Sequence, residues 1–164
     1  MNFEDKIDAE IYAIGAVLID SPFFQRSKQQ THHRKSTLYD HTMDMTRHAV
    51  KLCNIYEKKH ADEPHHLDRK NVIIAALCHD LGMIDRKEKY ANDFQAWRQH
   101  PEESARLAKL FFPDIDDVAL NAIRHHMFPI TLSPPRNLTE RIILQADKTI
   151  SIYDIHLLKK PFVQ

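Results

Sequence analysis

The chain has 164 residues, of which 43% are hydrophobic and 28% charged, an ordinary composition for one domain that can bury its own core. Lysine plus arginine equals aspartate plus glutamate at 23 each, so no net positive charge favours binding to a nucleic-acid duplex. Only two glycines are present, which argues against a glycine-rich phosphate loop and against a turn-rich all-β fold. Twelve histidines, scattered along the chain, are the one abnormal count.

The cysteines and the N-terminal charges indicate the compartment. Cys53 and Cys78 lie in apolar helical patterns and form no metal or redox motif with each other, which favours a reduced setting. Glu4, Asp5 and Asp8 occupy the region where a signal peptide needs positive charge, and no apolar run approaches membrane length. We therefore expect a cytoplasmic protein without a membrane partner.

Helical periodicity dominates the N-terminal half. Apolar residues recur at spacings of three and four between Phe3 and Leu18, which predicts an amphipathic helix ending near residues 20–22. The polar stretch 29–35, which contains His32 and His33, is too hydrophilic for a core and predicts a surface loop. Residues 38–57 return to the helical period, and the charged segment 58–69 predicts a connection.

Residues 70–81 predict a buried helix that ends in two adjacent metal-binding side chains, His79 and Asp80, with Gly82 as its C-cap. Burying an imidazole and a carboxylate at the end of an apolar helix is costly unless something compensates them. A metal ion would compensate both, whereas a His–Asp hydrogen bond within the helix cap would serve without one. This stretch alone leaves both interpretations open.

The C-terminal half predicts further helices. Residues 85–98 are charged with scattered aromatics and predict a loop with a helical turn. Pro101 fits the first position of a new helix, which Pro113 ends. Asp114 can cap the next helix, which closes at the pair His125 and His126.

A long last helix is predicted from residue 137 onward. Asn137 and Glu140 have capping-box spacing, and the helix carries Asp147 in its apolar middle. Lys148 is expected to be a poor partner for Asp147, since adjacent helix positions diverge, so this carboxylate needs another partner. No repeat, coiled coil or low-complexity tract interrupts the helices, and we predict an all-α domain.

Histidines and aspartates in helical, apolar settings form a series along the chain. Each one alone could be an ordinary core or surface residue, but all of them together indicate a shared site. The series consists of His41, His79, Asp80, His100, His126 and Asp147, with His125 beside them.

This ordered series resembles the HD-domain metal-dependent phosphohydrolases. The flanking residues agree in Leu38-Tyr-Asp-His41, Ala75-Ala-Leu-Cys-His-Asp-Leu-Gly82, His100-Pro-Glu-Glu-Ser-Ala105, Ala122-Ile-Arg-His-His126 and Ala146-Asp-Lys148. The match covers roughly residues 33–155, and it is specific as an ordered series where a single His–Asp pair is weak. The resemblance, closest to small single-domain bacterial members, implies a helical bundle of about six to eight helices. It also implies one HD-type domain over residues 1–164.

The resemblance implies a dinuclear metal site in which Asp80 bridges the two ions. The first ion would be held by His41, His79, Asp80 and Asp147. The second would be completed by His100 and His126, with His125 as an alternative or outer ligand. A ligand set rich in neutral imidazole favours Mn, Fe, Co, Ni or Zn over Mg or Ca.

The implied reaction is hydrolysis of a phosphoester, in a nucleotide or a related phosphorylated small molecule, by a hydroxide that bridges the two ions. Asp80 is the catalytic residue that we expect to be least replaceable. His33, Arg124 and Lys148 are candidate contacts to the substrate phosphate, although ordinary surface charge explains Arg124 and Lys148 equally well. Met83 stands where family members often have lysine, so this contact to phosphate is missing.

Two alternatives to a phosphohydrolase remain open. The same ligand pattern occurs in HD-type di-iron oxygenases, which bind dioxygen and cleave C–C or C–P bonds. The other alternative is a non-catalytic HD module that binds a nucleotide and signals to a partner. The intact ligand series argues against that module, because an idle site has no need of all six residues.

Overall fold

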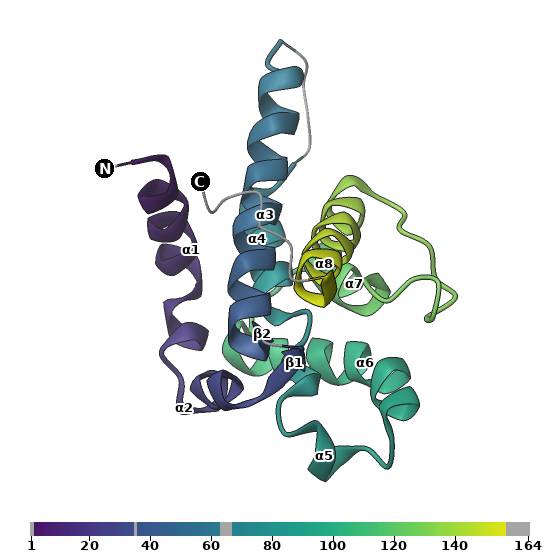
Figure 1. Ribbon diagram of the computed structural model, residues 1–164. Coiled ribbons are helices and arrows are strands. Elements are labelled where there is room, and N and C mark those ends of the chain that lie inside the picture. The colour runs from purple at the N-terminus through teal and green to yellow at the C-terminus, as the bar shows by residue number, and fades with distance from the viewer. Residues whose placement is uncertain (1, 35, 63–66, 157–164) are drawn as a thin grey trace.

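Eight α-helices, two 3-10 helices and one short hairpin make up the part of the chain that the computed structural model describes, which is residues 2–34, 36–62 and 67–156 (Figure 1). This architecture confirms the all-α prediction. In chain order the elements are α1 (Phe3–Ile19), α2 (Pro22–Gln25), η1 (Arg26–Gln29), β1 (Thr31–His33), β2 (Ser36–Thr37), α3 (Leu38–Lys59), α4 (Arg69–Cys78), η2 (Leu81–Met83), α5 (Arg86–Lys89), α6 (Asp93–Phe111), α7 (Asp117–His125) and α8 (Leu138–His156).

The apolar helix α4 is the centre of the core. Every side chain from Val72 to Cys78 is buried, because α4 packs against α1, α3, α7 and α8 at once. A helix that is apolar on all faces needs such a complete shell of neighbours. Figure 1 shows α1 on one side of the central pair α3 and α4, with α7 and α8 on the other. The end of α4 therefore carries His79 and Asp80 into the interior.

Helices α3 and α8 pack on each other and start from capping boxes or caps that the sequence encodes. At α3, the Asp40 backbone N–H donates to Thr37 Oγ1 at 3.0 Å. At α8, the Glu140 N–H donates to Asn137 Oδ1 at 3.0 Å, which confirms the predicted cap. Their packing brings His41, in the first turn of α3, against the middle of α8.

Two predicted helix starts are wrong. Helix α6 begins at Asp93, where Asn92 Oδ1 accepts the Gln95 N–H at 2.9 Å, and it runs through Pro101 instead of starting there. The cap at Asn92 nucleates the helix earlier than the proline suggested, and the buried Pro101 is accommodated inside it. Asp116, rather than Asp114, caps α7, because its Oδ1 accepts the Val118 N–H at 2.6 Å.

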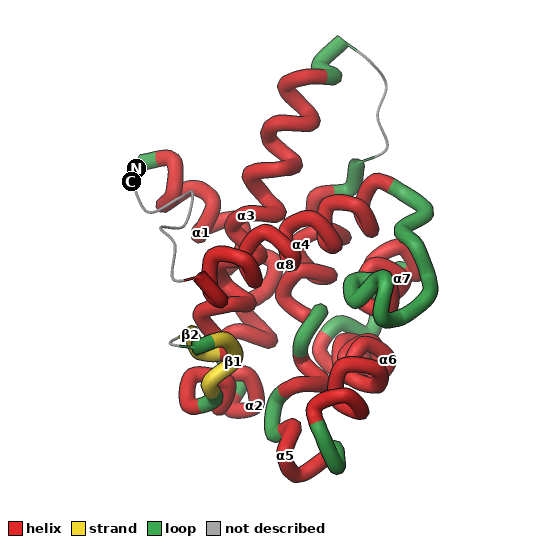
Figure 2. The backbone as a smooth tube through the Cα atoms, turned by 45° about the vertical axis from the view of Figure 1, so that its right-hand side comes forward, coloured by secondary structure: helices red, strands yellow, loops and turns green. Residues whose placement is uncertain are grey.

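The stretch predicted as a surface loop at 29–35 contains a hairpin. Strand β1 pairs antiparallel with β2, and Arg34 between them has a φ of 44°, in the left-handed region. The Gln30 side chain anchors the base of the hairpin to a distant loop: it accepts the Asp85 N–H and donates to Asp85 Oδ1, both at 3.0 Å. Figure 2 shows the hairpin beside α8, which β1 contacts. The polar composition predicted a surface loop, but these long-range contacts, which a local sequence pattern cannot show, hold the segment as a hairpin.

None of the helices in the described ranges combines the length and the apolar composition that a bilayer span requires.

Candidate metal centre

The turn after α4 presents Asp80. Helix α4 ends at Cys78, and η2 follows at once, so Gly82 lies in η2 and is not a C-cap. No glycine among the described residues has a positive φ. Gly82 is required for a different reason: a Cβ there would lie 2.5 Å from the His100 carbonyl oxygen. Its N–H donates to Ser104 Oγ at 2.8 Å, so the glycine lets η2 lie directly on α6.

Six of the predicted ligands converge in the interior from five segments of the chain. None is more than 5% exposed. Histidines and aspartates are rarely buried so completely unless they are paired or bind an ion. They are His41 on α3, His79 and Asp80 after α4, His100 on α6, His126 after α7 and Asp147 on α8.

The two carboxylate oxygens of Asp80 face two different groups of imidazoles. Asp80 Oδ1 lies 3.1 Å from His100 Nε2 and 3.5 Å from His126 Nε2. Asp80 Oδ2 lies 3.5 Å from His79 Nε2. Asp147 Oδ1 extends the second group, at 3.8 Å from His79 Nε2 and 3.3 Å from His41 Nε2. We call His41, His79 and Asp147 the α3–α8 half, and His100 and His126 the α6–α7 half; Asp80 is common to both.

Each of the four imidazoles is held by its Nδ1 atom. Backbone carbonyls accept at 2.7, 2.8 and 2.6 Å from the Nδ1 atoms of His79, His100 and His126, and these carbonyls belong to Ala76, Ala96 and Ile123. The Asp154 carboxylate accepts from His41 Nδ1 at 2.9 Å. Because carbonyl and carboxylate oxygens only accept, each Nδ1 carries a proton, and the Nε2 atoms turn toward the site. This arrangement is typical of metal-ligating histidines.

The donor set fits cations better than it fits a hydrogen-bond network. His79 Nε2 is buried and has no hydrogen-bond partner among the described residues. The Nε2 atoms of His100 and His126 lie 3.0 Å apart, so two lone pairs would oppose each other if both rings are neutral. Two nitrogen ligands of one ion, each at about 2.0–2.1 Å and at right angles, are also separated by about 3 Å. One metal ion at His79 and another at His100 and His126 would therefore satisfy all three nitrogens.

Electrostatics keep the carboxylates ionised. Burial alone would raise the pKa of Asp80, but its imidazole neighbours, His79 before His100 and His126, hold it well below its usual range. Burial opposes ionisation of Asp147 in the same way, and the hydrogen bond from His41 together with nearby imidazoles lowers its pKa. Anionic carboxylates beside imidazoles are the protonation state that a cation requires.

The imidazoles differ in protonation. Burial lowers the pKa of His79 to about 4, so its ring is neutral near neutral pH. Burial also disfavours the charged form of His41, but the hydrogen bonds to Asp147 and Asp154 outweigh it and raise the pKa of His41 to about 9. In the metal-free protein, His41 is therefore an imidazolium between two carboxylates.

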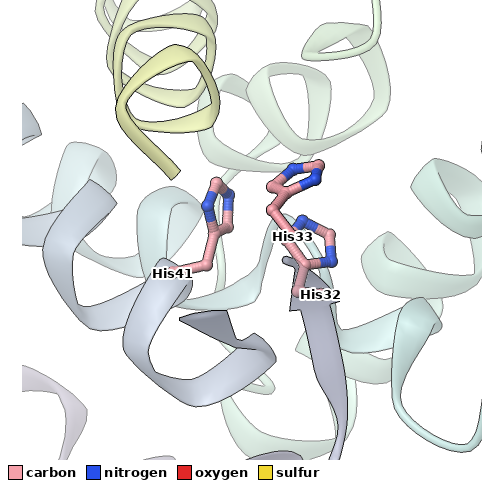
Figure 3. Close-up of side chains that lie close together, drawn as sticks. All are labelled: His32, His33 and His41. Atoms are coloured by element: carbon pink, nitrogen blue, oxygen red, sulfur yellow. The ribbon is translucent and has the colours of Figure 1, made fainter. Parts of the chain in front are cut away.

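Two residues near the site were missed in the sequence. Asp154, only 4% exposed, orients His41, and its position seven residues after Asp147 on one helix would have placed both on the same face. His32, on the unexpected hairpin, has its Nε2 3.5 Å from Asp80 Oδ2. Burial, reinforced by the nearby His41, lowers the pKa of His32 to about 3, so this ring is neutral as well. Figure 3 shows His32 and His33 of β1 next to His41 of α3.

Two predicted site residues lie elsewhere. His125 turns away from the cluster, and its Nδ1 contacts Glu140 Oε2 at 2.9 Å, because neighbouring helical positions point in different directions. Arg124 donates to Glu102 Oε2 at 2.9 Å on the surface. Neither side chain joins the cluster, and of the pair 125–126 it is His126 that reaches Asp80.

Lys148 and His33 lie at the site. The Lys148 Nζ is 3.3 Å from Asp147 Oδ2, so the expectation that Lys148 is a poor partner for Asp147 is wrong. The lysine side chain is long enough to fold back along the helix. Both Lys148 and His33 line a cavity of about 380 Å³ that reaches Asp80, His100 and Asp147.

The rest of this cavity wall combines charge with apolar surface. Met83, in place of the lysine common in the resembling proteins, lines it, and Arg86 supplies a cation nearby. Trp97, Met127 and Ile130 form the apolar part of the lining. A concave, mostly apolar space with a few convergent polar groups is typical of a small-molecule site.

Comparison with known proteins gave one finding. A protein-family model described as "HD domain" matches residues 38–154, a range that contains all six converging ligands. No curated protein and no solved structure matches the chain significantly.

Proposed function

The chain belongs to the HD-domain superfamily of metal-dependent phosphohydrolases, and we propose that it hydrolyses a phosphoester in a nucleotide or a related phosphorylated small molecule. The observation that carries this proposal is the division of Asp80: Oδ1 faces the imidazoles of His100 and His126, and Oδ2 faces His79. One carboxylate between two donor groups suits a pair of ions that share it.

The chain's own residues prepare such a pair. The Nδ1 hydrogen bonds fix the imidazole rings, and the lowered pKa values of Asp80 and Asp147 keep both carboxylates anionic. Two divalent ions would lower the pKa of a bound water molecule to about 7, so that it could serve as nucleophile, and would neutralise charge on the phosphate oxygens. The imidazole-rich donor set suits Mn, Fe, Co, Ni or Zn.

Substrate binding would use the cavity beside Asp80. Lys148 and Arg86 offer positive charge to phosphate, and His33 offers a further polar contact. Trp97 and Ile130 offer apolar surface to the organic part of the substrate. The volume of about 380 Å³ is appropriate for a small molecule.

A metal-dependent hydrolysis assay tests the proposal. The metal-free full-length protein would be reloaded with Mn, Fe, Co, Ni or Zn and offered a panel of nucleotides and other phosphoesters. Asp80→Ala and the isosteric Asp80→Asn should lower turnover more than about 100-fold, beyond the 10–100-fold typical of losing an outer partner of a metal ligand. Asp114→Ala, which removes an exposed aspartate away from the site, is the matched control and should retain full activity.

Turnover that is unchanged in Asp80→Ala would contradict the proposal. So would a native protein that holds two irons, consumes dioxygen and hydrolyses no phosphoester, because that behaviour belongs to an oxygenase.

A further inference from the structure

The hairpin carries a histidine that the six-ligand set leaves without a role. We propose that His32 is a further ligand in the α3–α8 half, so that this half holds its ion with five side chains and the α6–α7 half receives the substrate. This inference rests on the metal centre of the proposed function. It adds a residue, and an asymmetry, that the six-residue series does not contain.

The position of His32 matches that of a ligand. Its Nε2 lies 3.5 Å from Asp80 Oδ2, the same distance that separates His79 Nε2 from that oxygen. His32, His33 and His41 each offer a nitrogen within 4.8 Å of the others, and the His32 ring is the nearer of the two to His41, with centroids 4.5 Å apart. His32 therefore lies on the side of Asp80 that faces the α3–α8 half.

The hairpin geometry directs His32 inward. In a regular strand, successive side chains point to opposite faces. Here the register is irregular between Thr31 and His33, and the His32 and His33 rings lie together, with centroids 4.1 Å apart (Figure 3). The His32 side chain is only 11% exposed, whereas His33 is half-buried and its ring is farther from His41, at 5.5 Å. His32, whose Nε2 lies 3.5 Å from Asp80 Oδ2, is therefore the better placed of the two as a ligand, and His33 is the comparison variant that separates the two roles.

A network outside the metal centre holds the hairpin in place. Besides the two Gln30–Asp85 hydrogen bonds, Arg26 donates to Asp85 Oδ2 through Nη2 at 2.9 Å. Asp85 itself has a φ of 59°, a conformation that costs free energy for a residue other than glycine. These contacts fix the strand that carries His32, although none of their side chains reaches the carboxylate of Asp80.

Counting donors shows the asymmetry. With His32, the α3–α8 half offers five side chains, which are His32, His41, His79, Asp80 and Asp147. The α6–α7 half offers three, which are Asp80, His100 and His126. Since first-row ions in such sites commonly take up to about six ligands, the α6–α7 half has more positions left for phosphate oxygens.

Metal titration of the full-length, metal-free protein tests the inference without reference to turnover. Isothermal titration with Mn²⁺ should show two binding steps in the wild type. His32→Ala should weaken one step by at least about tenfold, because losing a direct ligand should cost no less than losing an outer partner. The other step should stay within twofold, and His33→Ala should leave both steps within twofold. If His32→Ala does not fold, as judged by circular dichroism, His32→Gln keeps a polar side chain in the hairpin and should weaken the same step.

Inorganic phosphate separates a ligand from a substrate contact. If His32→Ala keeps both metal steps and weakens only phosphate binding to the loaded protein, the inference is overturned and His32 contacts substrate. A third ion that disappears in both His32→Ala and His33→Ala would overturn it as well, in favour of a separate site on the hairpin. A wild type that binds no ion would instead reject the metal centre of the proposed function itself.

Discussion

The two halves of the metal centre are built from the same residue types but are supported differently. In the α6–α7 half, His100 and His126 are oriented by neutral backbone carbonyls from their own helices. In the α3–α8 half, a backbone carbonyl orients His79 in the same way, but His41 is oriented by the carboxylate of Asp154, near the end of α8. A carboxylate behind an imidazole stabilises positive charge on it, whereas a carbonyl does so less strongly. In the α3–α8 half, this carboxylate helps to raise the pKa of His41 to about 9, so His41 stays protonated near neutral pH.

Among the variants that test this difference, we expect the largest change in metal affinity when Asp154 is replaced. Asp154→Asn keeps the size of the side chain but removes its charge, so His41 becomes a weaker donor. After correction for the proton that the ion displaces from His41, we expect the affinity of one metal step to fall about 10–100-fold, the usual range for such partners, while the other step stays within twofold. Titration with Mn²⁺ measures both. An equal loss in both steps, or no loss in either, would mean that the two halves are not supported differently.

The number of protons released when metal binds is the second test of this difference. His41 has a pKa raised to about 9, so near pH 7.5 the metal-free protein carries a proton on Nε2 that an ion must displace. His32 and His79, with pKa values near 3 and 4, are already neutral and release none. Affinity for metal should therefore rise with pH up to about 9 and then level off, with about one proton released per protein at pH 7.5.

Calorimetry in buffers of different ionisation enthalpy measures this proton. Asp154→Asn serves as the matched variant: it should lower the pKa of His41 and reduce the release at pH 7.5. Release of no proton by the wild type between pH 7 and 8.5 would contradict the assignment of an imidazolium at His41.

The smallest expected effects concern the two basic residues that flank the site in sequence. Lys148 lines the cavity, whereas Arg124 pairs with Glu102 outside it. Lys148→Ala should lower kcat/KM by up to about fivefold, since an exposed charge contact contributes about 0.2–1 kcal/mol. Arg124→Ala should leave kcat/KM unchanged. Steady-state kinetics with the best phosphoester would decide, and a larger loss in Arg124→Ala would show that the cavity is not the substrate site.

The elements with strong periodicity were predicted well from the sequence. The apolar run of α4 and the caps of α8 are local features, so the helices and the convergence of six ligands followed from residue pattern and resemblance. The predicted end of α4 was wrong, because Gly82 is needed for the close approach to His100 and not as a C-cap. The predicted start of α6 was wrong, because the Asn92 cap starts the helix before Pro101. Both depend on contacts between elements.

The hairpin shows why the other parts of the fold and of the site could not be predicted from the sequence. Thr31, His32 and His33 are polar and give no strand or core signal. The hairpin that partly buries His32 and His33 is anchored through Gln30 to Asp85, more than fifty residues away. The role of Asp154 could have been predicted, since it lies two turns after Asp147 on one face of α8. His125 was assigned as a possible ligand because sequence adjacency could not choose between it and His126.

The sharing of Asp80 between two ions is the central claim, and X-ray absorption spectroscopy of the metal-loaded protein tests it most directly. The wild type should show metal–metal scattering at about 3.5–4 Å, the separation typical of two-metal sites. Asp80→Ala should lose that scattering. A spectrum that fits a single isolated ion in the fully loaded wild type would contradict the account.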